Sequence, residues 1–401
     1  MDTLKKAKIE KGVLGKLCYV ATFFLVFLSF VYKNELLILY SFEVFYILLI
    51  GLYIIKRNIK IGKYALWSAA FFTVCLLSYI YSVDQVAAFR QIFNVLKILL
   101  IGNTIVFFID KNKKKINFIL ISIILSAIYL TVLLIIQTPL SYWGTNRLGS
   151  NIGLNANDLG LKMAISSLIA IYFAKENKKA HLYILAFIFS TITLFSGSRK
   201  AFLLILIGLF FLYILTIKRR RRLLFVIPVL SGIVYLFWYI VMNNTDLYNV
   251  LGVRIEQLLN ALSGEGNVDN STIVRFQMID EGINLFKERP FLGYGIDNYA
   301  SISTFSTYSH NNYIELLVGV GIFGTVIYYS LYVSIFFKLI KFVRVNKIAG
   351  LFISIILGLA ILEYGLVTYY IEIFVILLAA AYSAADISNK LSYLNHDKKD
   401  E

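Results

Sequence analysis

A histidine that precedes an apolar stretch is the residue whose type and position best suit catalysis. His310 directly precedes the apolar stretch 311–337. It belongs to the polar run 309–315, which overlaps the start of that stretch. Asn312 and Glu315 have the spacing of a capping box, which predicts a helix that begins near Asn312. The positive end of that helix disfavours a protonated imidazole. A neutral imidazole can accept a proton from an attacking hydroxyl, so His310 is a candidate general base. Helix capping or acceptor binding is the alternative.

Arg275 is the second candidate, and it lies in the longest polar interval of the chain, residues 243–309. Polar capping residues before 272 and Pro290 after it predict a helix over 272–289. On a helical wheel Arg275 falls on the apolar side, against the protein body. The planar guanidinium suits a phosphate or carboxylate. The alternative is a first-turn arginine that extends to water.

Two shorter segments add cations. The loop 142–158 is rich in Gly and Asn and contains Arg147 and Asn157. Its backbone N–H groups and Arg147 could hold an anion, although an ordinary solvated loop has the same composition.

The very short turn 196–200 confines Arg199 and Lys200 close to the bilayer. They indicate an anion site there, with contacts to lipid headgroups as the alternative.

Further cations lie where they are costly or oppose the usual orientation of membrane proteins. Arg90 and Lys97 share one stripe of the predicted helix 86–109. A charge near mid-bilayer costs roughly 2.5–3.5 kcal/mol, so Lys97 should face the interior of the bundle. Glu43 is a possible partner for Lys97, and a purely structural pair is as plausible as a functional lysine. Arg289 lies on the predicted outer side, where a cation suggests a ligand.

These side chains must be positioned by membrane-spanning helices. The 401 residues are 59% hydrophobic and 15% charged, with a mean hydropathy of +0.76. Apolar runs of about 20 residues recur along the chain, each long enough to cross a bilayer. We expect an all-α polytopic membrane protein with about twelve spans, at 13–31, 36–55, 64–82, 86–109, 116–137, 157–174, 181–196, 201–217, 223–242, 311–337, 348–366 and 369–386.

The connections between these spans alternate in charge, and this alternation predicts the topology. Basic clusters recur in every second connection, at the N-terminus, 56–63, 111–115, 175–179, 218–222, 338–347 and the C-terminal tail. Positive charge stays in the cytoplasm. We therefore expect a multi-pass protein of the cytoplasmic membrane, the inner or plasma membrane, with both termini cytoplasmic. The chain, 1–401, is expected to form one integral membrane domain with a large extracytoplasmic loop over 243–310 between the ninth and tenth spans.

The composition argues against several other classes. The net charge of +16 follows from the topology, and the short separate basic runs lack the aromatic platform of a nucleic-acid site. Cys18 and Cys75 lie in apolar runs and imply no disulfide. The three histidines are too scattered for a metal site. We expect neither a metal nor a cofactor.

Four ordered blocks over residues 140–335 resemble the O-antigen ligase / Wzy-type polysaccharide polymerase superfamily. The family patterns are an Arg-x-x-Gly stretch before a helix that starts at an Asn, a Ser-Arg turn, an Arg-containing loop helix that ends in Pro-x-x-Gly-x-Gly, and a His-Asn that opens a span containing Gly-x-x-Gly. The corresponding residues are 147–157, 196–199, 275–295 and 310–324. The first five predicted spans carry no recognisable family motif.

The resemblance implies a GT-C-like helical fold and a metal-independent glycosyltransferase. Members transfer a glycan from undecaprenyl pyrophosphate to an acceptor hydroxyl. By this resemblance Arg147, Arg199 and Arg275 bind the pyrophosphate and His310 serves the acceptor side. The remaining outer-side polar candidates are substrate contacts, namely Lys200, Arg90, Lys97, Asn157 and Arg289.

The acceptor separates two activities within the family. It is another lipid-linked repeat unit in the polymerases of capsular polysaccharide, exopolysaccharide or O-antigen, and the lipid A core or another molecule in ligases. We favour a polymerase because the large loop contains no obvious further domain. Expected partners are the lipid-linked donor and acceptor, the bilayer, a chain-length regulator and a flippase.

A twelve-span transporter or polysaccharide flippase is the alternative from another class. Transporter folds usually show internal repeats and helices broken in paired halves. No repeat is apparent in this sequence, which contains only three prolines and places most of its polar residues near the predicted outer surface.

Overall fold

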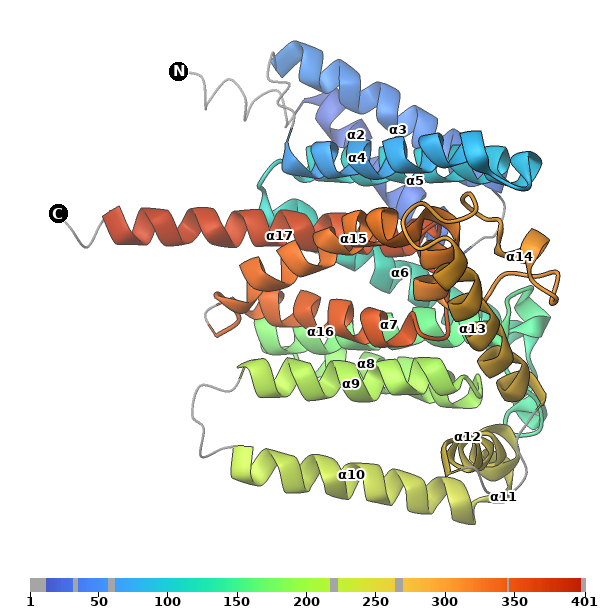
Figure 1. The fold of residues 1–401 in the computed structure, drawn as a ribbon. Coiled ribbons are helices and arrows are strands. Elements are labelled where there is room, and N and C mark those ends of the chain that lie inside the picture. Colours follow the sequence, from blue (N-terminus) through green and yellow to red (C-terminus); the bar gives the residue numbers. More distant parts are fainter. Residues whose placement is uncertain are drawn as a thin grey trace. The chain divides into compact units, whose positions relative to one another are not determined.

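The computed structural model describes residues 12–31, 35–56, 62–216, 223–263, 270–344 and 346–397. Within these ranges all regular structure is helical, apart from an isolated bridge between Trp143 and Asn146 (Figure 1). The expected all-α class is therefore confirmed for the described part of the chain.

Each expected apolar segment is a helix in the structure. The helices are α2 (Val13–Val31), α3 (Glu35–Lys56), α4 (Lys63–Ser78), continued by η1 (Tyr79–Tyr81), α5 (Gln85–Ile109), α6 (Lys113–Gln137), α7 (Ala156–Asn177), α8 (His181–Phe195), α9 (Arg199–Thr216), α10 (Leu223–Asn243), α15 (Asn312–Ile340), α16 (Lys347–Leu362) and α17 (Glu372–Asp397).

Five of the described helices are long and apolar enough to cross a bilayer: Val13–Val31, Lys63–Tyr81, Gln85–Ile109, Lys113–Gln137 and Asn312–Ile340. Two shorter helices, His181–Phe195 and Lys347–Leu362, are also apolar. These lengths indicate a multi-pass membrane protein. Twelve crossings and the GT-C-like arrangement stay predictions.

The polar interval after α10 is largely helical. It contains α11 (Thr245–Leu247), η5 (Tyr248–Gly252), α12 (Val253–Ser263), α13 (Asn270–Glu288) and α14 (Tyr299–Ile302). The expected helix over 272–289 is α13, which begins slightly earlier and ends before Pro290. Short turns η2 (Leu140–Tyr142) and η3 (Ser150–Ile152) precede α7.

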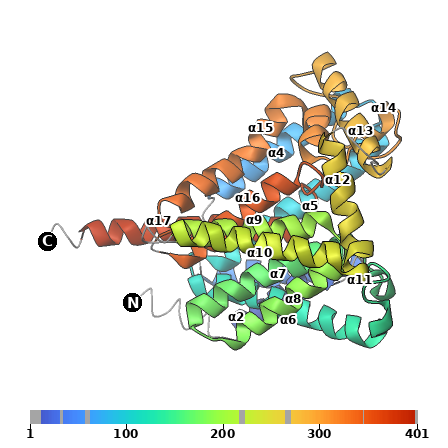
Figure 2. The same cartoon turned by 90° about the horizontal axis from the view of Figure 1, so that it is seen from below.

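The chain divides into two compact units. Unit 1 comprises the described residues of Met1–Ser126, Glu281–Lys338 and Leu366–Glu401, and unit 2 those of Ala127–Asp280 and Leu339–Gly365. In unit 1, α5 packs against α3, α4 and α17, and α2 packs against α3 and α17. In unit 2, α7 packs against α8, α9 and α16, and α16 also lies along α9 (Figures 1 and 2).

Small residues allow the close packing in unit 2. A Cβ on Gly208 of α9 would collide with Leu168, and one on Gly358 of α16 would collide with Leu204. Because helices approach most closely where side chains are smallest, these glycines hold α7, α9 and α16 together. That packing fixes the ends of the helices from which the polar residues of unit 2 project.

Helix α15 of unit 1 was expected as one uninterrupted span, and it is broken at Gly321, whose φ of 64° and ψ of −170° are not helical. The segment after α13 replaces the lost intrahelical bonds. Tyr294 N–H donates to the Val318 oxygen at 2.8 Å, Gly295 N–H to the Gly319 oxygen at 2.9 Å, and Ile322 N–H to the Pro290 oxygen at 2.9 Å. This pairing ties the residues after Pro290 to the break.

Several residues on which the topology prediction rests lie outside the described residues. They are the N-terminal lysines, Arg57, Lys60 and the basic run 218–222. The cytoplasmic placement of both termini stays a prediction.

Candidate functional site

A cluster of cations lies in unit 2, and Arg147 connects the loop before α7 to the turn before α9. Its Nε donates to the Ser196 oxygen at 3.0 Å, and its Nη2 donates to Asn157 Oδ1 at 2.8 Å. A backbone bond from Leu148 N–H to the Phe195 oxygen, 3.2 Å long, joins the same two segments. The structure therefore brings Arg147 and Asn157 into direct contact.

Local chemistry explains this geometry. Asn155 caps α7 by accepting from Asn157 N–H at 2.8 Å. Gly149 has φ 130°, and a Cβ there would lie 2.9 Å from the Leu154 oxygen, so glycine is required. Gly160 lets Ser196 pack against α7, since a Cβ on Gly160 would collide with the Ser196 hydroxyl.

Arg199 and Lys200 begin α9, ahead of its apolar stretch. Arg199 Nη1 donates to the Arg254 oxygen at 2.9 Å, and Nη2 lies 3.4 Å from Thr272 Oγ1. Lys200 Nζ donates to the Gly365 oxygen. Arg199 thus connects α9 to α12 and α13, the polar helices that follow α10.

The charges of two further arginines, Arg254 and Arg275, act on these side chains. Burial, together with the charges of Arg254 and then Arg199, lowers the pKa of Arg147 to about 10. Burial also lowers the pKa of Lys200 to about 7, with contributions from Arg275 and then Arg199. We call Arg147, Arg199, Lys200, Arg254 and Arg275 the cation cluster. Because like charges are costly together, a bound anion would stabilise them.

Arg254 is not among the candidate residues that the sequence analysis selected. Its carbonyl accepts from Arg199, and its charge acts on Arg147. The only indication in the sequence was that Arg254 lies in the polar interval 243–309. On α7, Lys162 Nζ lies 3.0 Å from Asp158 Oδ2, an ion pair one helical turn apart.

A second group of polar residues lies in unit 1, at the start of α15. The expected capping box of Asn312 and Glu315 is wrong, because Asn311 caps the helix. Asn311 Oδ1 accepts from Tyr313 N–H at 2.9 Å and from Ile314 N–H at 3.1 Å. Glu315 instead accepts from the N–H of Ser309 at 2.9 Å and from its hydroxyl at 2.7 Å.

These bonds fix the backbone on both sides of His310. His310 has a φ of 56°, in the left-handed region, and its ring centroid lies 4.1 Å from that of Tyr308. The backbone of His310 is thereby held between Ser309 and the cap of α15. Its ring is partly exposed and can be reached by a substrate.

Asn312 has a structural role different from the expected cap. Its amide donates to the Tyr329 hydroxyl at 2.9 Å, and its Oδ1 accepts from Thr368 N–H at 2.9 Å and Tyr369 N–H at 3.2 Å. Gln91 of α5 donates to the Tyr369 hydroxyl at 2.9 Å. The start of α15 is therefore joined to α5 through the segment before α17.

Carboxylates that the sequence reasoning did not single out complete this end of unit 1. Asn298 accepts from Asp84 N–H at 2.6 Å, and Asp84 caps α5. Burial raises the pKa of Asp297 to about 6; Arg90 partly opposes this increase and Asp84 adds to it. Asp297 has a φ of 61°. In the sequence, the available indication was that Asp297 lies two residues after the turn formed by Gly293 and Gly295. We call this group, Asp84, Arg90, Asp297, His310 and Glu315, the carboxylate–histidine end.

The other predicted cations of unit 1 are already engaged. Lys97 Nζ lies 2.9 Å from Glu372 Oε1, so the expected partner Glu43, which is exposed, is wrong. The guanidinium of Arg289 lies 4.5 Å from the ring centre of Tyr294. Arg90, Lys97, Arg289 and His310 thus belong to unit 1 and the cation cluster to unit 2.

The described residues contain no group of three or more His, Cys, Asp or Glu that could hold a metal ion. Cys18 and Cys75 are buried, and they form no disulfide within the described residues.

A comparison with known protein families matches residues 184–329 to the O-antigen ligase family model. This match supports the resemblance of the chain to the O-antigen ligase/Wzy-type superfamily. The matched O-antigen ligase region contains Arg199, Lys200, Arg254, Arg275 and His310, whereas Arg147 and Asn157 precede it. The match indicates O-antigen ligase- or polymerase-type activity and a membrane enzyme similar to glycosyltransferases. No curated protein matches the chain.

Proposed function

We propose that this protein polymerises lipid-linked oligosaccharide repeat units at the outer face of the cytoplasmic membrane. The donor is a glycan on undecaprenyl pyrophosphate, and the acceptor is a hydroxyl of a second lipid-linked unit. The cation cluster carries this proposal, because guanidinium groups from separate segments converge within the unit that contains most of the family match.

The cluster is suited to the leaving group. When the bond between the anomeric carbon and the pyrophosphate oxygen breaks, negative charge develops on the pyrophosphate. Arg199 and Arg275 offer planar forks that can each bind two phosphate oxygens. Preorganised cations stabilise that charge more in the transition state than in the ground state, and such stabilisation accelerates the transfer. This role requires no metal.

The carboxylate–histidine end is suited to the acceptor. As the acceptor oxygen attacks the anomeric carbon, His310 accepts the hydroxyl proton and undecaprenyl pyrophosphate leaves. The Ser309 bonds to Glu315 hold the backbone beside His310. The charges of Asp297 and Arg90 lie at the same end of unit 1 and influence how the acceptor sugar binds. Burial raises the pKa of Asp297. Lys97 and Arg289 are peripheral contacts in this scheme.

A ligase-type transfer to the lipid A core or another acceptor is the second candidate, because the matching family model is that of O-antigen ligase. Both reactions use the same donor chemistry and differ in the acceptor. A flippase would deliver the lipid-linked units, and a chain-length regulator would limit polymer growth.

The test is transfer by the purified full chain in lipid nanodiscs with undecaprenyl-pyrophosphate-linked repeat units as sole substrate. We expect a ladder of lipid-linked oligomers, unaffected by a chelator. Single transfer onto added lipid A core without a ladder would favour the ligase. No product with either acceptor, or complete loss with the chelator, would contradict the proposed chemistry.

The outer location is testable by cysteine labelling in intact cells. Asn284 on α13 and Lys114 on α6 are both exposed, and the native cysteines are buried. An impermeant thiol reagent should label Asn284→Cys and spare Lys114→Cys. The reverse pattern would overturn the proposed topology.

A further inference from the structure

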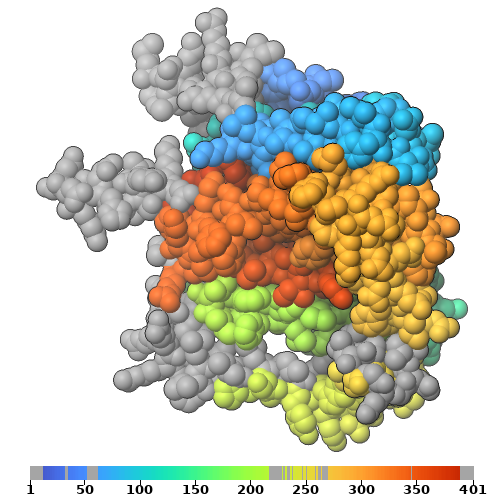
Figure 3. Space-filling view, in the orientation of Figure 1, coloured from blue at the N-terminus to red at the C-terminus, as the bar shows by residue number. Residues whose placement is uncertain are grey.

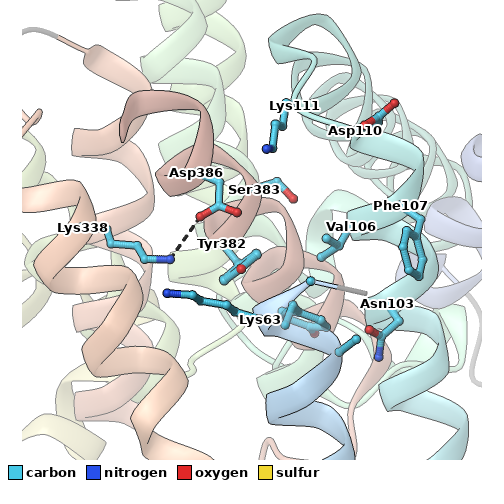
Figure 4. A pocket seen from close by; sticks show the side chains of 13 residues that line it. Lys63, Asn103, Val106, Phe107, Asp110, Lys111, Lys338, Tyr382, Ser383 and Asp386 are labelled. Carbon is cyan, nitrogen blue, oxygen red and sulfur yellow. Dashed lines mark hydrogen bonds and ion pairs between the residues drawn. The ribbon is translucent and has the colours of Figure 1, made fainter. Parts of the chain in front are cut away.

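A pocket of about 520 Å³ lies in unit 1, within the described residues (Figure 4). It is lined by the first turn of α4, the end of α5 and polar side chains of α15 and α17. Lys63, Lys111 and Lys338 belong to the connections that the charge pattern assigns to the cytoplasm. The carboxylate–histidine end lies at the opposite ends of α4 and α5, so this pocket is separate from the proposed acceptor site.

The lining is positive on balance. Lys338 Nζ lies 3.1 Å from Asp386 Oδ1, and these two charges neutralise each other. Lys63 and Lys111 have no ion-pair partner among the described residues, and Asp110 is the remaining carboxylate of the lining. The pocket therefore has a surplus of cationic charge.

The start of α4 adds to this charge. Gly62 is the N-cap and provides no side-chain hydrogen bond. The first N–H groups of a helix lack intrahelical acceptors and carry partial positive charge. Gly62, Lys63, Tyr64 and Ala65 line the pocket, so the first turn of α4, which carries these N–H groups, lies beside it. A phosphate oxygen suits both kinds of donor.

The surface beside the pocket is apolar. Helix α4 is the least covered of the five long apolar helices, with 28% of its apolar stretch buried compared with 39–56% in the others. Leu66 is 63% exposed, Leu77 52% and Ile80 73%. Their spacing places them along one side of α4 and its continuation η1. Figure 3 shows that α4 is uncovered on the face toward the viewer. A ligand with a charged head and an acyl chain matches both surfaces.

We propose that this pocket binds the phosphodiester headgroup of an anionic phospholipid of the cytoplasmic leaflet, with an acyl chain along α4. Lys63, Lys111 and the first N–H groups of α4 contact the phosphate. Asn103 and Ser383 line the same pocket and can bond to headgroup hydroxyls. The bound lipid would fill the space between α4, α5 and α17 and stabilise unit 1. This inference does not depend on the transfer reaction.

The test uses the purified full chain, delipidated and then given equal amounts of phosphatidylglycerol and phosphatidylethanolamine. Native mass spectrometry counts the lipids retained. We expect the wild type to retain phosphatidylglycerol preferentially. The double variant Lys63→Gln/Lys111→Gln should bind it at least about tenfold more weakly, since it loses two charge-assisted contacts.

The control is Lys114→Gln/Lys179→Gln, which removes the same charge from exposed lysines outside the pocket. It should bind like the wild type, and thermal unfolding should show both double variants folded. Unchanged binding in the pocket variant, equal loss in the control, or equal retention of phosphatidylethanolamine would overturn the proposal. Water-soluble glycerophosphoglycerol should not displace the lipid at equal concentration; if it does, the site binds a free phosphodiester instead.

Discussion

The two polar regions differ in charge. The cation cluster of unit 2 consists of basic side chains, and burial together with neighbouring cations lowers the pKa values of two of them, Arg147 and Lys200. The carboxylate–histidine end of unit 1 combines Asp84, Asp297, Glu315 and His310 with a single arginine, Arg90. An enzyme that removes a pyrophosphate and activates a hydroxyl needs both environments. From this difference we propose that unit 2 binds the donor and unit 1 the acceptor.

The largest expected effect follows from removing the proposed base. His310→Ala should lower the single-turnover transfer rate by about 10²–10⁴-fold, the usual contribution of a positioned general base. The wild-type rate should rise through an ionisation between about pH 5.5 and 7.5, the range in which histidine normally titrates. An active His310→Ala with an unchanged pH profile would reduce His310 to a structural or binding residue.

Arg275→Lys retains the charge and removes the fork. Transfer should fall by about ten- to a hundredfold, because a charge-assisted bond contributes roughly 1.5–3 kcal/mol. Transfer is measured at equal protein level, with exposed Lys287→Arg on the same helix as the control. A normal rate in Arg275→Lys would remove this residue from the donor site.

Gly293→Ala should destabilise unit 1. Gly293 has φ 75°, and an added Cβ would collide with the Val318 oxygen at the break in α15. The backbone strain alone costs about 1–3 kcal/mol. Gly153 has φ 70° with open space around it, so Gly153→Ala isolates the strain from the collision. Thermal unfolding should show the larger loss for Gly293→Ala; equal losses would mean that the pairing with α15 is unimportant.

The smallest effect concerns pH. With a pKa of about 7, Lys200 loses its charge as pH rises above neutrality. Donor binding should therefore weaken several-fold between about pH 6 and 8.5. Lys200→Arg stays charged and should remove this dependence, whereas Lys200→Gln should bind weakly at both values. A pH-dependent Lys200→Arg would assign the titration to another group.

Hydropathy and residue types predicted the positions of the helices and most of the cation cluster. Apolar runs set most helix ends within a few residues, although α17 continues to Asp397, well beyond the expected end at 386. The short turn 196–200 confined Arg199 and Lys200 regardless of tertiary packing. The contact between Arg147 and Asn157 is also local, since only a compact loop separates them.

The missed features depend on packing between segments far apart in the sequence. Lys97 pairs with Glu372 rather than Glu43 because α5 packs against α17. Asn312 is not the cap because its side chain bonds to the segment before α17. The break at Gly321 needs the acceptors and donors of residues after Pro290. Neither charge patterns nor helical periodicity encode these pairings.

Donor binding measured separately from transfer tests the central claim most directly. Binding of undecaprenyl-pyrophosphate-linked glycan to nanodisc-embedded protein is compared for wild type, Arg275→Lys and His310→Ala. If unit 2 holds the pyrophosphate and unit 1 activates the acceptor, Arg275→Lys loses affinity by about tenfold or more, and His310→Ala binds normally while its transfer fails. Normal binding by Arg275→Lys together with lost binding by His310→Ala would contradict this assignment.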